Sequence, residues 1–284
     1  FRDLEGIIDY LYALGITTIY AAPIFQSTPG SMHGYDVTDP HRINPEIGSL
    51  SELKSLARKL KSKNMSWIQD IVPNHMAFHV NNFRLMDVLE RGKYSPYHQY
   101  FDIDWEHPAE HLKGKLQVPF LGDSIEECVK KKEVNISFSE KGFTVDYFTT
   151  SYPLSLSSFE YLFNEAESSV FSWKEFVNMG RSAREYADWK KDKEYYLSSI
   201  TNNERLYIPI LEWIEKINND PSKVLSLLQQ QDYFLTCWKD TEKEINYRRF
   251  FTVNELICLR MEVEAVFVEY HSFLHALYRE NLIQ

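Results

Sequence analysis

The segment at residues 33–40, HGYDVTDP, gathers side chains that could bind a polar ligand. His33 and Asp36 can form hydrogen bonds with hydroxyl groups, and the ring of Tyr35 can stack on a flat ligand face. The same residue types are typical of tight turns, in which Asp side chains bond to nearby backbone. A binding loop and a local turn cluster therefore remain two open interpretations of this segment.

The segment at residues 70–75, DIVPNH, is the second candidate. Asp70 lies in an otherwise apolar run that predicts a strand over residues 66–72, and a buried carboxylate is costly unless it is paired. We expect an arginine or other donors beside it, although the sequence offers no obvious partner. Asn74 and His75 follow where the strand gives way to loop, the place where a parallel sheet presents its functional residues. The alternative is structural: a strand-end aspartate, a capping asparagine and a histidine with satisfied hydrogen bonds.

Other kinds of site find less support. His75 and His79 have the spacing of two zinc ligands on a helix, but they follow Pro73 in an expected loop and the glutamate of the HExxH motif is absent. The sequence has neither a nucleophile elbow nor a glycine-rich phosphate loop. The pair Arg248 and Arg249 is more typical of a solvated surface than of a ligand clamp. We expect no metal and no cofactor.

The elements around both clusters follow the alternation of a parallel α/β protein. Residues 3–14 predict a helix that ends before Gly15, and Ser49 or Ser51 can cap a second helix. Strands are expected at residues 16–23 and 66–72. Each is followed by a long polar loop, at residues 24–48 and 73–82 respectively. Strands of this kind are buried on both faces and present functional residues at their carboxyl ends, where both loops begin.

The regular alternation breaks after residue 82. Two apolar runs, VPFLG and FTVDYF, predict short strands. Three longer segments predict helices, at residues 160–180, 206–217 and 221–239. This stretch reads as a separate subdomain inserted after the second strand. Residues 255–280 then show apolar positions at steps of three and four, which predicts a strong amphipathic helix.

Three parts are therefore expected along the chain. Residues 1–82 form the start of an α/β domain, 83–250 form an inserted and mainly helical subdomain, and 251–284 return to the α/β domain. A closed eightfold barrel needs roughly 250 residues, so the α/β part can supply only a portion of one.

The composition narrows the class of protein. A net charge of −10 argues against a nucleic-acid binder, because such proteins normally present a basic face. Aromatic residues make up 15% of the chain, which predicts a large aromatic core and leaves open that some rings stack on sugars. The three cysteines, Cys128, Cys237 and Cys258, lack metal-ligand spacing and are typical of reduced thiols in a cytoplasmic protein. No apolar run approaches the roughly 18 residues of a membrane span.

Several motifs in a fixed order are similar to those of a known enzyme family. LGITTIYAAPIFQS, then GSMHGYDVTDPHRINPEIG, then DIVPNH resemble the front of the α-amylase family of retaining glycosidases and transglycosidases. MDVLERG, SPYHQYFDIDW and INYRRFFTVNELICLRME resemble its maltooligosyl trehalose synthase branch, from which Thr252 departs because the branch tends to carry aspartate there. The resemblance covers nearly the whole chain. It implies an α/β fold, a partial TIM (β/α)8 barrel with a large inserted subdomain after the DIVPNH strand.

The family also implies a role for each candidate residue. Tyr35 would stack on the glucose unit beside the scissile bond, and His75 would bond to the hydroxyls of that sugar. Asp70 would be a structural carboxylate that pairs with an arginine on the next strand. Asn74 is a calcium ligand in many amylases, but the synthase branch need not use calcium. The weaker candidates for lining the cleft are His33, Asp36 and Arg249.

The reaction implied by the resemblance is a double displacement on an α-1,4-glucan. One carboxylate attacks the anomeric carbon while a second carboxyl group acts as acid and then base, the two lying about 5–5.5 Å apart. In the synthase branch the reducing-end glucose itself is the acceptor. Its α-1,4 link becomes an α,α-1,1 link, and the product is maltooligosyl trehalose. A trehalose-releasing hydrolase is the implied next enzyme.

The catalytic carboxylates of the family are expected outside this sequence. The nucleophile follows a strand that should come directly after the helix ending near Glu280, whereas the sequence ends at Gln284, and the family's first strand should precede residue 3. We therefore expect a fragment that is inactive alone, since loss of one catalytic group costs many orders of magnitude. The alternatives are an α-amylase or 4-α-glucanotransferase of the same family, and a non-catalytic glucan-binding relative.

Overall fold

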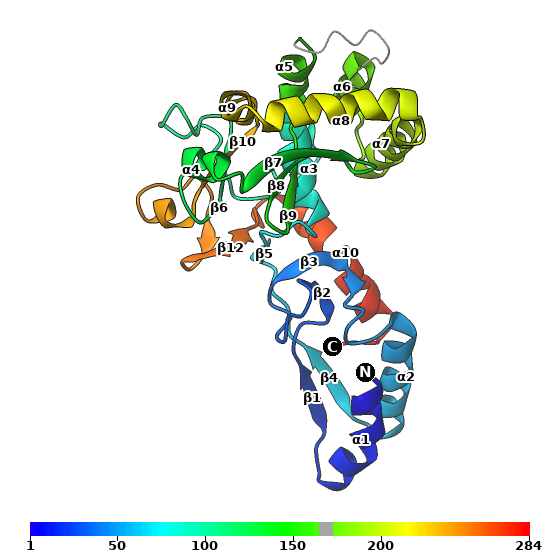
Figure 1. Ribbon diagram of the computed structural model, residues 1–284. Helices are drawn as coiled ribbons and strands as arrows, with labels where there is room; N and C mark the ends of the chain where they lie inside the picture. The colour runs from blue at the N-terminus through cyan, green and yellow to red at the C-terminus, as the bar shows by residue number, and fades with distance from the viewer. Residues whose placement is uncertain (165–172) are drawn as a thin grey trace. The chain divides into compact units, whose positions relative to one another are not determined.

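The computed structural model describes residues 1–164 and 173–284. They form two compact units (Figure 1). The first, which we call the α/β unit, consists of residues 1–82 and 249–284, and the second, the inserted unit, consists of residues 83–248. Among the described helices, none is long and apolar enough to cross a membrane.

The α/β unit is built on two parallel strands and two helices. Strand β1 (Thr18–Ala21) pairs with β4 (Ser66–Gln69), and helix α2 (Leu50–Ser62) packs against β4 and against α1 (Arg2–Ala13). Both helices confirm the prediction from their end signals. Gly15 after α1 has a φ of +90°, and Ser49 caps α2 in a capping box with Glu52.

The two parallel strands are shorter and more exposed than predicted. They end at Ala21 and Gln69, so Asp70 lies just beyond the strand rather than inside it, with its N–H donating to the carbonyl of Ala21 at 2.9 Å. Tyr20 and Ile68 are paired across the strands and are 68% and 46% exposed. The prediction that both faces of these strands are buried was wrong. Helix α2 packs against β4 on the face away from the Ile68 side chain, and in the described chain this sheet has only two strands.

The two predicted loops contain strands. Residues 24–48 hold β2 (Phe25–Ser27) and β3 (Val37–Ile43), which pair antiparallel, and residues 73–82 hold β5 (His75–Ala77). The prediction of irregular loops was wrong because turn-forming residues mask apolar ones such as Phe25 and Val37, which are buried.

The C-terminal helix begins later than predicted. Strand β12 (Val253–Cys258) pairs antiparallel with β5 and with β11 (Arg249–Phe250), and helix α10 covers only Glu264–Arg279. The apolar spacing at the start of the segment belongs to a strand, whose hydrogen bonds come from the distant β5. Helix α10 packs against β3, and Tyr270 donates to the carbonyl of Val72 at 2.7 Å.

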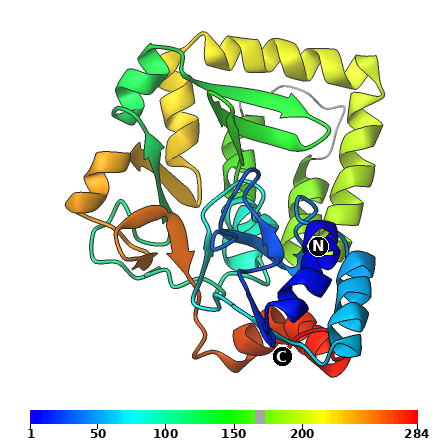
Figure 2. The same ribbon diagram turned by 90° about the horizontal axis from the view of Figure 1, so that it is seen from below.

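The inserted unit mixes helices with two small sheets (Figures 1 and 2). Strands β7, β8 and β9 form an antiparallel sheet against which α8 packs, while β6 and β10 pair in parallel. Its elements are α3 (Phe83–Arg91), η1 (Gly92–Tyr94), β6 (Leu116–Leu121), α4 (Ile125–Lys130), β7 (Val134–Ser139), β8 (Gly142–Tyr147), β9 (Thr150–Pro153), η2 (Leu156–Ser158), α5 (Phe159–Asn164), α6 (Trp173–Ser182), α7 (Tyr186–Thr201), α8 (Glu204–Asn218), α9 (Pro221–Gln229), β10 (Tyr233–Cys237) and η3 (Trp238–Glu242).

Most local predictions for this unit are confirmed. The runs VPFLG and FTVDYF lie in or overlap β6 and β8, and residues 206–217 lie in α8. Residues 160–180 give α5 and α6, with 165–172 outside the described residues. The helix predicted over residues 221–239 was wrong in its second half. The aromatic and β-branched run YFLTC forms β10 instead, because it pairs with β6 across a long sequence separation.

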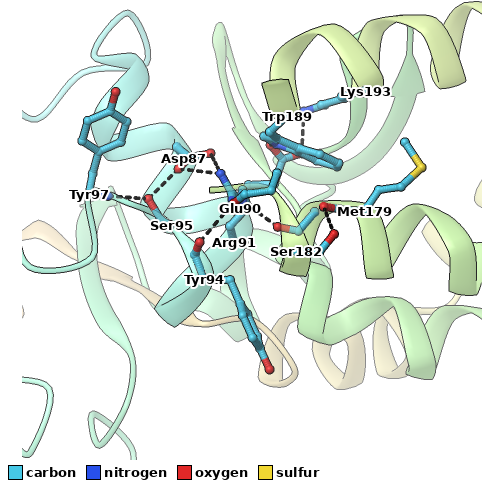
Figure 3. A network of polar contacts seen from close by, with 12 residues as sticks. Asp87, Glu90, Arg91, Tyr94, Ser95, Tyr97, Met179, Ser182, Trp189 and Lys193 are labelled. Carbon is cyan, nitrogen blue, oxygen red and sulfur yellow. Dashed lines mark hydrogen bonds and ion pairs between the residues drawn. The ribbon is translucent and has the colours of Figure 1, made fainter. Parts of the chain in front are cut away.

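A buried polar network joins α3 to α6 and α7 (Figure 3). The guanidinium of Arg91 donates to the carbonyls of Gly180 (2.8 Å) and Tyr94 (2.9 Å) and pairs with Asp87 on the same helix (3.4 Å). The preceding residue, Glu90, accepts hydrogen bonds from the indole of Trp189 (3.2 Å) and from Lys193. Since buried charges are stable only when fully paired, this network fixes how the three helices pack.

Candidate functional site

The loop between β2 and β3 is organised by Asp36. Its carboxylate accepts hydrogen bonds from the hydroxyls of Thr28 and Ser31, the latter at 2.5 Å. Gly34 has a φ of +74°, and a Cβ there would lie 2.7 Å from the carbonyl oxygen of Pro23. Only glycine fits this position, and the resulting turn brings Tyr35 toward the end of β4. The partners of Asp36 are therefore side-chain hydroxyls of its own loop.

Asp70 and Tyr35 meet at the carboxyl end of the parallel strands. The phenol of Tyr35 donates to Oδ2 of Asp70 at 2.8 Å, and Tyr20 on β1 also hydrogen-bonds to this carboxylate. The bond to Asp70 is the main cause that raises the pKa of both tyrosines above the ordinary value, because it favours the neutral phenol. The donors expected beside Asp70 are thus supplied by two tyrosines.

Sequence reasoning missed Tyr20. The signal was present, since Tyr20 is the aromatic residue at the carboxyl end of the run ITTIY, and carboxyl ends present functional side chains in a parallel sheet. Its contact with Asp70 depends on the pairing of β1 with β4, which local sequence does not specify.

His75 lies behind Tyr35 and is only 1% exposed. Its Nε2 is 3.1 Å from the backbone oxygen of Tyr35, its Nδ1 is 3.0 Å from the side-chain oxygen Oδ1 of Asn74, and its ring stacks on Phe250 with centroids 4.3 Å apart. Burial is the main cause that lowers the pKa of His75, so the ring is neutral and can donate only once. Both neighbouring atoms, the carbonyl oxygen of Tyr35 and Oδ1 of Asn74, accept hydrogen bonds, so the neutral ring donates to one of them at a time.

The remaining candidates lie around this core. The ring of His33 is exposed and stacks on that of Tyr35 at 5.7 Å, and its Nδ1 accepts the backbone N–H of Tyr35 at 3.0 Å. Arg249 precedes Phe250, but its guanidinium donates to Oδ1 of Asn254 at 2.5 Å, within the β11–β12 turn. Phe250 was not predicted, although the aromatic pair in YRRFF was a visible signal.

The arrangement is suited to binding. The ring of Tyr35 is 41% exposed, yet its phenol is held by Asp70 and its backbone by His75 and His33. A fixed aromatic face of this kind can stack on an apolar ligand face without losing much conformational entropy. In the part of the chain that the structure describes, no three His, Cys, Asp or Glu side chains come close enough to hold a metal ion.

Comparison with known proteins places the chain in a family. The alpha amylase catalytic-domain family matches residues 2–158, which is 157 of the 284 residues. A putative maltooligosyl trehalose synthase of Mycobacterium tuberculosis is 41% identical over 124 residues, which cover 43% of this chain and 16% of that protein.

Solved structures resemble the chain over nearly its whole length. A hypothetical maltooligosyl trehalose synthase of Sulfolobus tokodaii is 32% identical, with a TM-score of 0.64 over 96% of this chain. The maltooligosyltrehalose synthase of Arthrobacter ramosus is 26% identical, with a TM-score of 0.69 over 99% of this chain. The chain spans 28% of the length of each. With the catalytic-domain match over more than half of its residues, the chain belongs to the α-amylase family.

Proposed function

We propose that the whole protein is a maltooligosyl trehalose synthase. This intramolecular transglucosylase converts the reducing-end α-1,4 link of a maltooligosaccharide to an α,α-1,1 link. The observation that carries the proposal is the similarity to solved synthases over 96–99% of the chain, because that share takes in the inserted unit as well as the α/β unit.

The Tyr35 cluster supports a sugar-binding role in this reaction. We propose that the exposed ring of Tyr35 stacks on the glucose unit next to the bond that breaks, and that Asp70 holds this ring in place. His75 would contribute a hydrogen bond to a sugar hydroxyl by exchanging one of its present partners. The neighbours with weaker roles in the cleft are Asn74, His33, Asp36 and Arg249. A transfer reaction also requires that water be kept from the intermediate, which a closely stacked ring favours.

Product analysis of the whole protein tests the proposal. Incubated with maltopentaose, it should remove reducing power without releasing glucose or shorter maltosaccharides. The Tyr35→Ala variant should lose at least tenfold in kcat/KM, whereas Tyr10→Ala, which removes an exposed tyrosine of α1, should change neither constant. Equal effects of the two substitutions would refute a binding role for Tyr35.

An α-amylase or 4-α-glucanotransferase is the second candidate. It is favoured by one observation: the α-amylase 2 of Dictyoglomus thermophilum is 26% identical over 263 residues, which cover 86% of this chain and 45% of that protein. Release of glucose or a ladder of maltosaccharides from maltopentaose would establish this candidate. Tight maltopentaose binding with no product of either kind would indicate a non-catalytic glucan-binding protein.

Two further parts of the proposal concern the surroundings of the reaction. The product, a maltooligosaccharide ending in trehalose, requires a hydrolase that releases trehalose as the next step. The cysteines Cys128, Cys237 and Cys258 are all unpaired, which is in keeping with the cytoplasm as the compartment we propose.

A further inference from the structure

The inserted unit contains a cleft of about 430 Å³, within the range of about 300–1,000 Å³ that holds small-molecule ligands. Residues from several separate parts of the chain line it, and the lining residues used below are Lys93, Tyr94, His98, Trp105, Arg181 and Asp232. None of these residues belongs to the Tyr35 cluster.

One wall of the cleft is formed where the side chain of Asp232 lies against the backbone of Gly92. Gly92 has a φ of +54°, and a Cβ there would lie 2.5 Å from Oδ2 of Asp232. The backbone N–H of Asp232 donates to the hydroxyl of Ser155 at 2.9 Å. Glycine at position 92 lets the carboxylate of Asp232 lie directly against the chain, and a larger residue there would push this carboxylate aside.

A second wall is held by the buried network around Arg91. The guanidinium of Arg91 donates to the carbonyl of Tyr94, and Figure 3 shows the Tyr94 ring pointing away from that network. Lys93 and Arg181 lie over this ring, 5.4 Å and 5.6 Å from its centroid. Two cations are thus gathered on one aromatic side chain at the edge of the cleft.

Two polar atoms of the lining have no hydrogen-bond partner. They are Nδ1 of His98 and Nε of Arg181, and among the described residues the other buried side-chain atom of this kind is Oε1 of Gln117. Buried polar groups without a partner are rare in native proteins. Both atoms are shielded from solvent in this structure, so the cleft is bounded by polar side chains whose hydrogen-bonding capacity is not fully used.

The charges and rings of the lining define the ligand. Lys93 and Arg181 are balanced by Asp232 and by Glu106, which also lines the cleft, and the third cation, Arg91, is already paired with Asp87. A net charge on the ligand therefore gains little. The ring of Trp105 stacks on that of His98 at 4.3 Å, which adds a flat aromatic surface. A neutral ligand with several hydroxyls suits these groups, because each hydroxyl can both donate and accept.

We propose that this cleft is an accessory site for a short α-1,4-glucan, with one or two glucose units against Trp105 and Tyr94 and their hydroxyls bonded to Lys93, Arg181 and Asp232. The neutral polyhydroxyl class follows from the cleft itself, whereas the choice of an α-glucan rests on the proposed function. Such a site would hold a maltooligosaccharide independently of the Tyr35 cluster.

Titration of the full chain with maltotriose tests this proposal. Calorimetry on a Tyr35→Ala background, in which the other candidate site is weakened, should still detect binding. Adding Trp105→Ala or Lys93→Met should weaken that binding at least tenfold. The matched control is Trp238→Ala, which removes a half-exposed tryptophan elsewhere in the inserted unit and should leave the dissociation constant unchanged.

Lys93 is exposed, so its substitution keeps the test valid if Trp105→Ala does not fold. Equal binding by Trp105→Ala, Lys93→Met and the control would overturn the proposal. So would binding of inorganic phosphate at the cleft in place of maltotriose, since that would mark an anion site. Failure of maltotriose to bind here, with trehalose-type product still formed by the whole protein, would overturn the accessory site and leave the proposed function standing.

Discussion

Asp70 is the residue on which the candidate site depends most. It lies one position beyond β4 and accepts hydrogen bonds from tyrosines of two different segments, Tyr20 on β1 and Tyr35 in the β2–β3 loop. The carboxylate therefore acts through the rings that it orients. Its own substitution should be felt first in the titration of those phenols.

The Asp70→Asn variant should lower the pKa of both Tyr20 and Tyr35 toward the ordinary tyrosine value. The bond to Asp70 is the largest cause of both raised pKa values, and the amide removes the negative charge that opposes tyrosinate. Carbon-13 NMR of labelled tyrosine rings against pH measures this, with Tyr20→Phe and Tyr35→Phe assigning the two signals. An unchanged midpoint for both signals would contradict the site as described.

Gly34→Ala should destabilise the α/β unit by more than Gly30→Ala. Both glycines have positive φ, +74° and +77°, so both variants carry the strain of a left-handed backbone. Only at position 34 does the added methyl meet the carbonyl of Pro23, which should cost roughly 1–3 kcal/mol more. Chemical denaturation of the two variants measures the difference, and equal losses would mean that the close contact has no energetic weight.

Helix α3 is the element that anchors the inserted unit. Its charged residues Asp87, Glu90 and Arg91 are buried and reach across to α6 and α7 (Figure 3). Burial is the main cause that raises the pKa of Asp87 to about 6, although Arg91 and Ser95 oppose the shift. The stability of this element should therefore depend on pH.

The sign of that pH dependence follows from the pKa of Asp87 in the folded and unfolded states. The unfolded pKa of aspartate is about 3.9, so the folded state binds the Asp87 proton more tightly between about pH 4 and 6. Stability from this group is present below that window and is lost as the pH rises through it. The stability of the wild type relative to Asp87→Asn should fall by up to ~3 kcal/mol across the window.

Denaturant unfolding at pH 4.5, 5.5 and 7, values chosen to span roughly that window, measures this difference. Asp9→Asn is the control of opposite sign, because hydrogen bonds from Lys63 and Lys59 lower the pKa of Asp9. The contribution of Asp9 to the free energy of unfolding should instead be lost as the pH falls. If the stability of the wild type relative to Asp87→Asn rose with pH, the result would contradict a buried Asp87 with a raised pKa.

The elements that local sequence predicted well carry their own end signals. Helix α1 is followed by Gly15 and α2 begins with the Ser49–Glu52 capping box, and both formed as expected. Strand β12 and strand β10 were mistaken for helix because their partners β5 and β6 lie far away in sequence. An apolar run a few residues long does not distinguish a strand from a helix until that partner is known.

The same distinction separates the candidate site residues that the sequence indicated from those that it did not. Tyr35, Asp70 and His75 lie in polar segments after apolar runs, so their residue types stood out. Tyr20 and Phe250 reach the cluster only through strand pairing and ring stacking, which the sequence does not display. Sequence reasoning therefore located the cluster but not the partners that hold it.

At the scale of the whole molecule, two compact units together resemble synthase structures of which they span 28%. The family follows from the matched residues, whereas the reaction belongs to the whole protein. The central claim is that this reaction moves a bond within one sugar chain and leaves the number of glucose units unchanged. Mass and reducing-end chemistry distinguish that outcome from hydrolysis.

The most direct test is mass spectrometry of the products that the whole protein forms from maltopentaose, before and after treatment with borodeuteride. We predict a product of the same mass as the substrate that does not take up deuterium, because its reducing end has become an α,α-1,1 link. Products of lower mass that take up deuterium would mean hydrolysis. A set of shorter and longer reducing chains would mean transfer between molecules, and either result would contradict the proposed function.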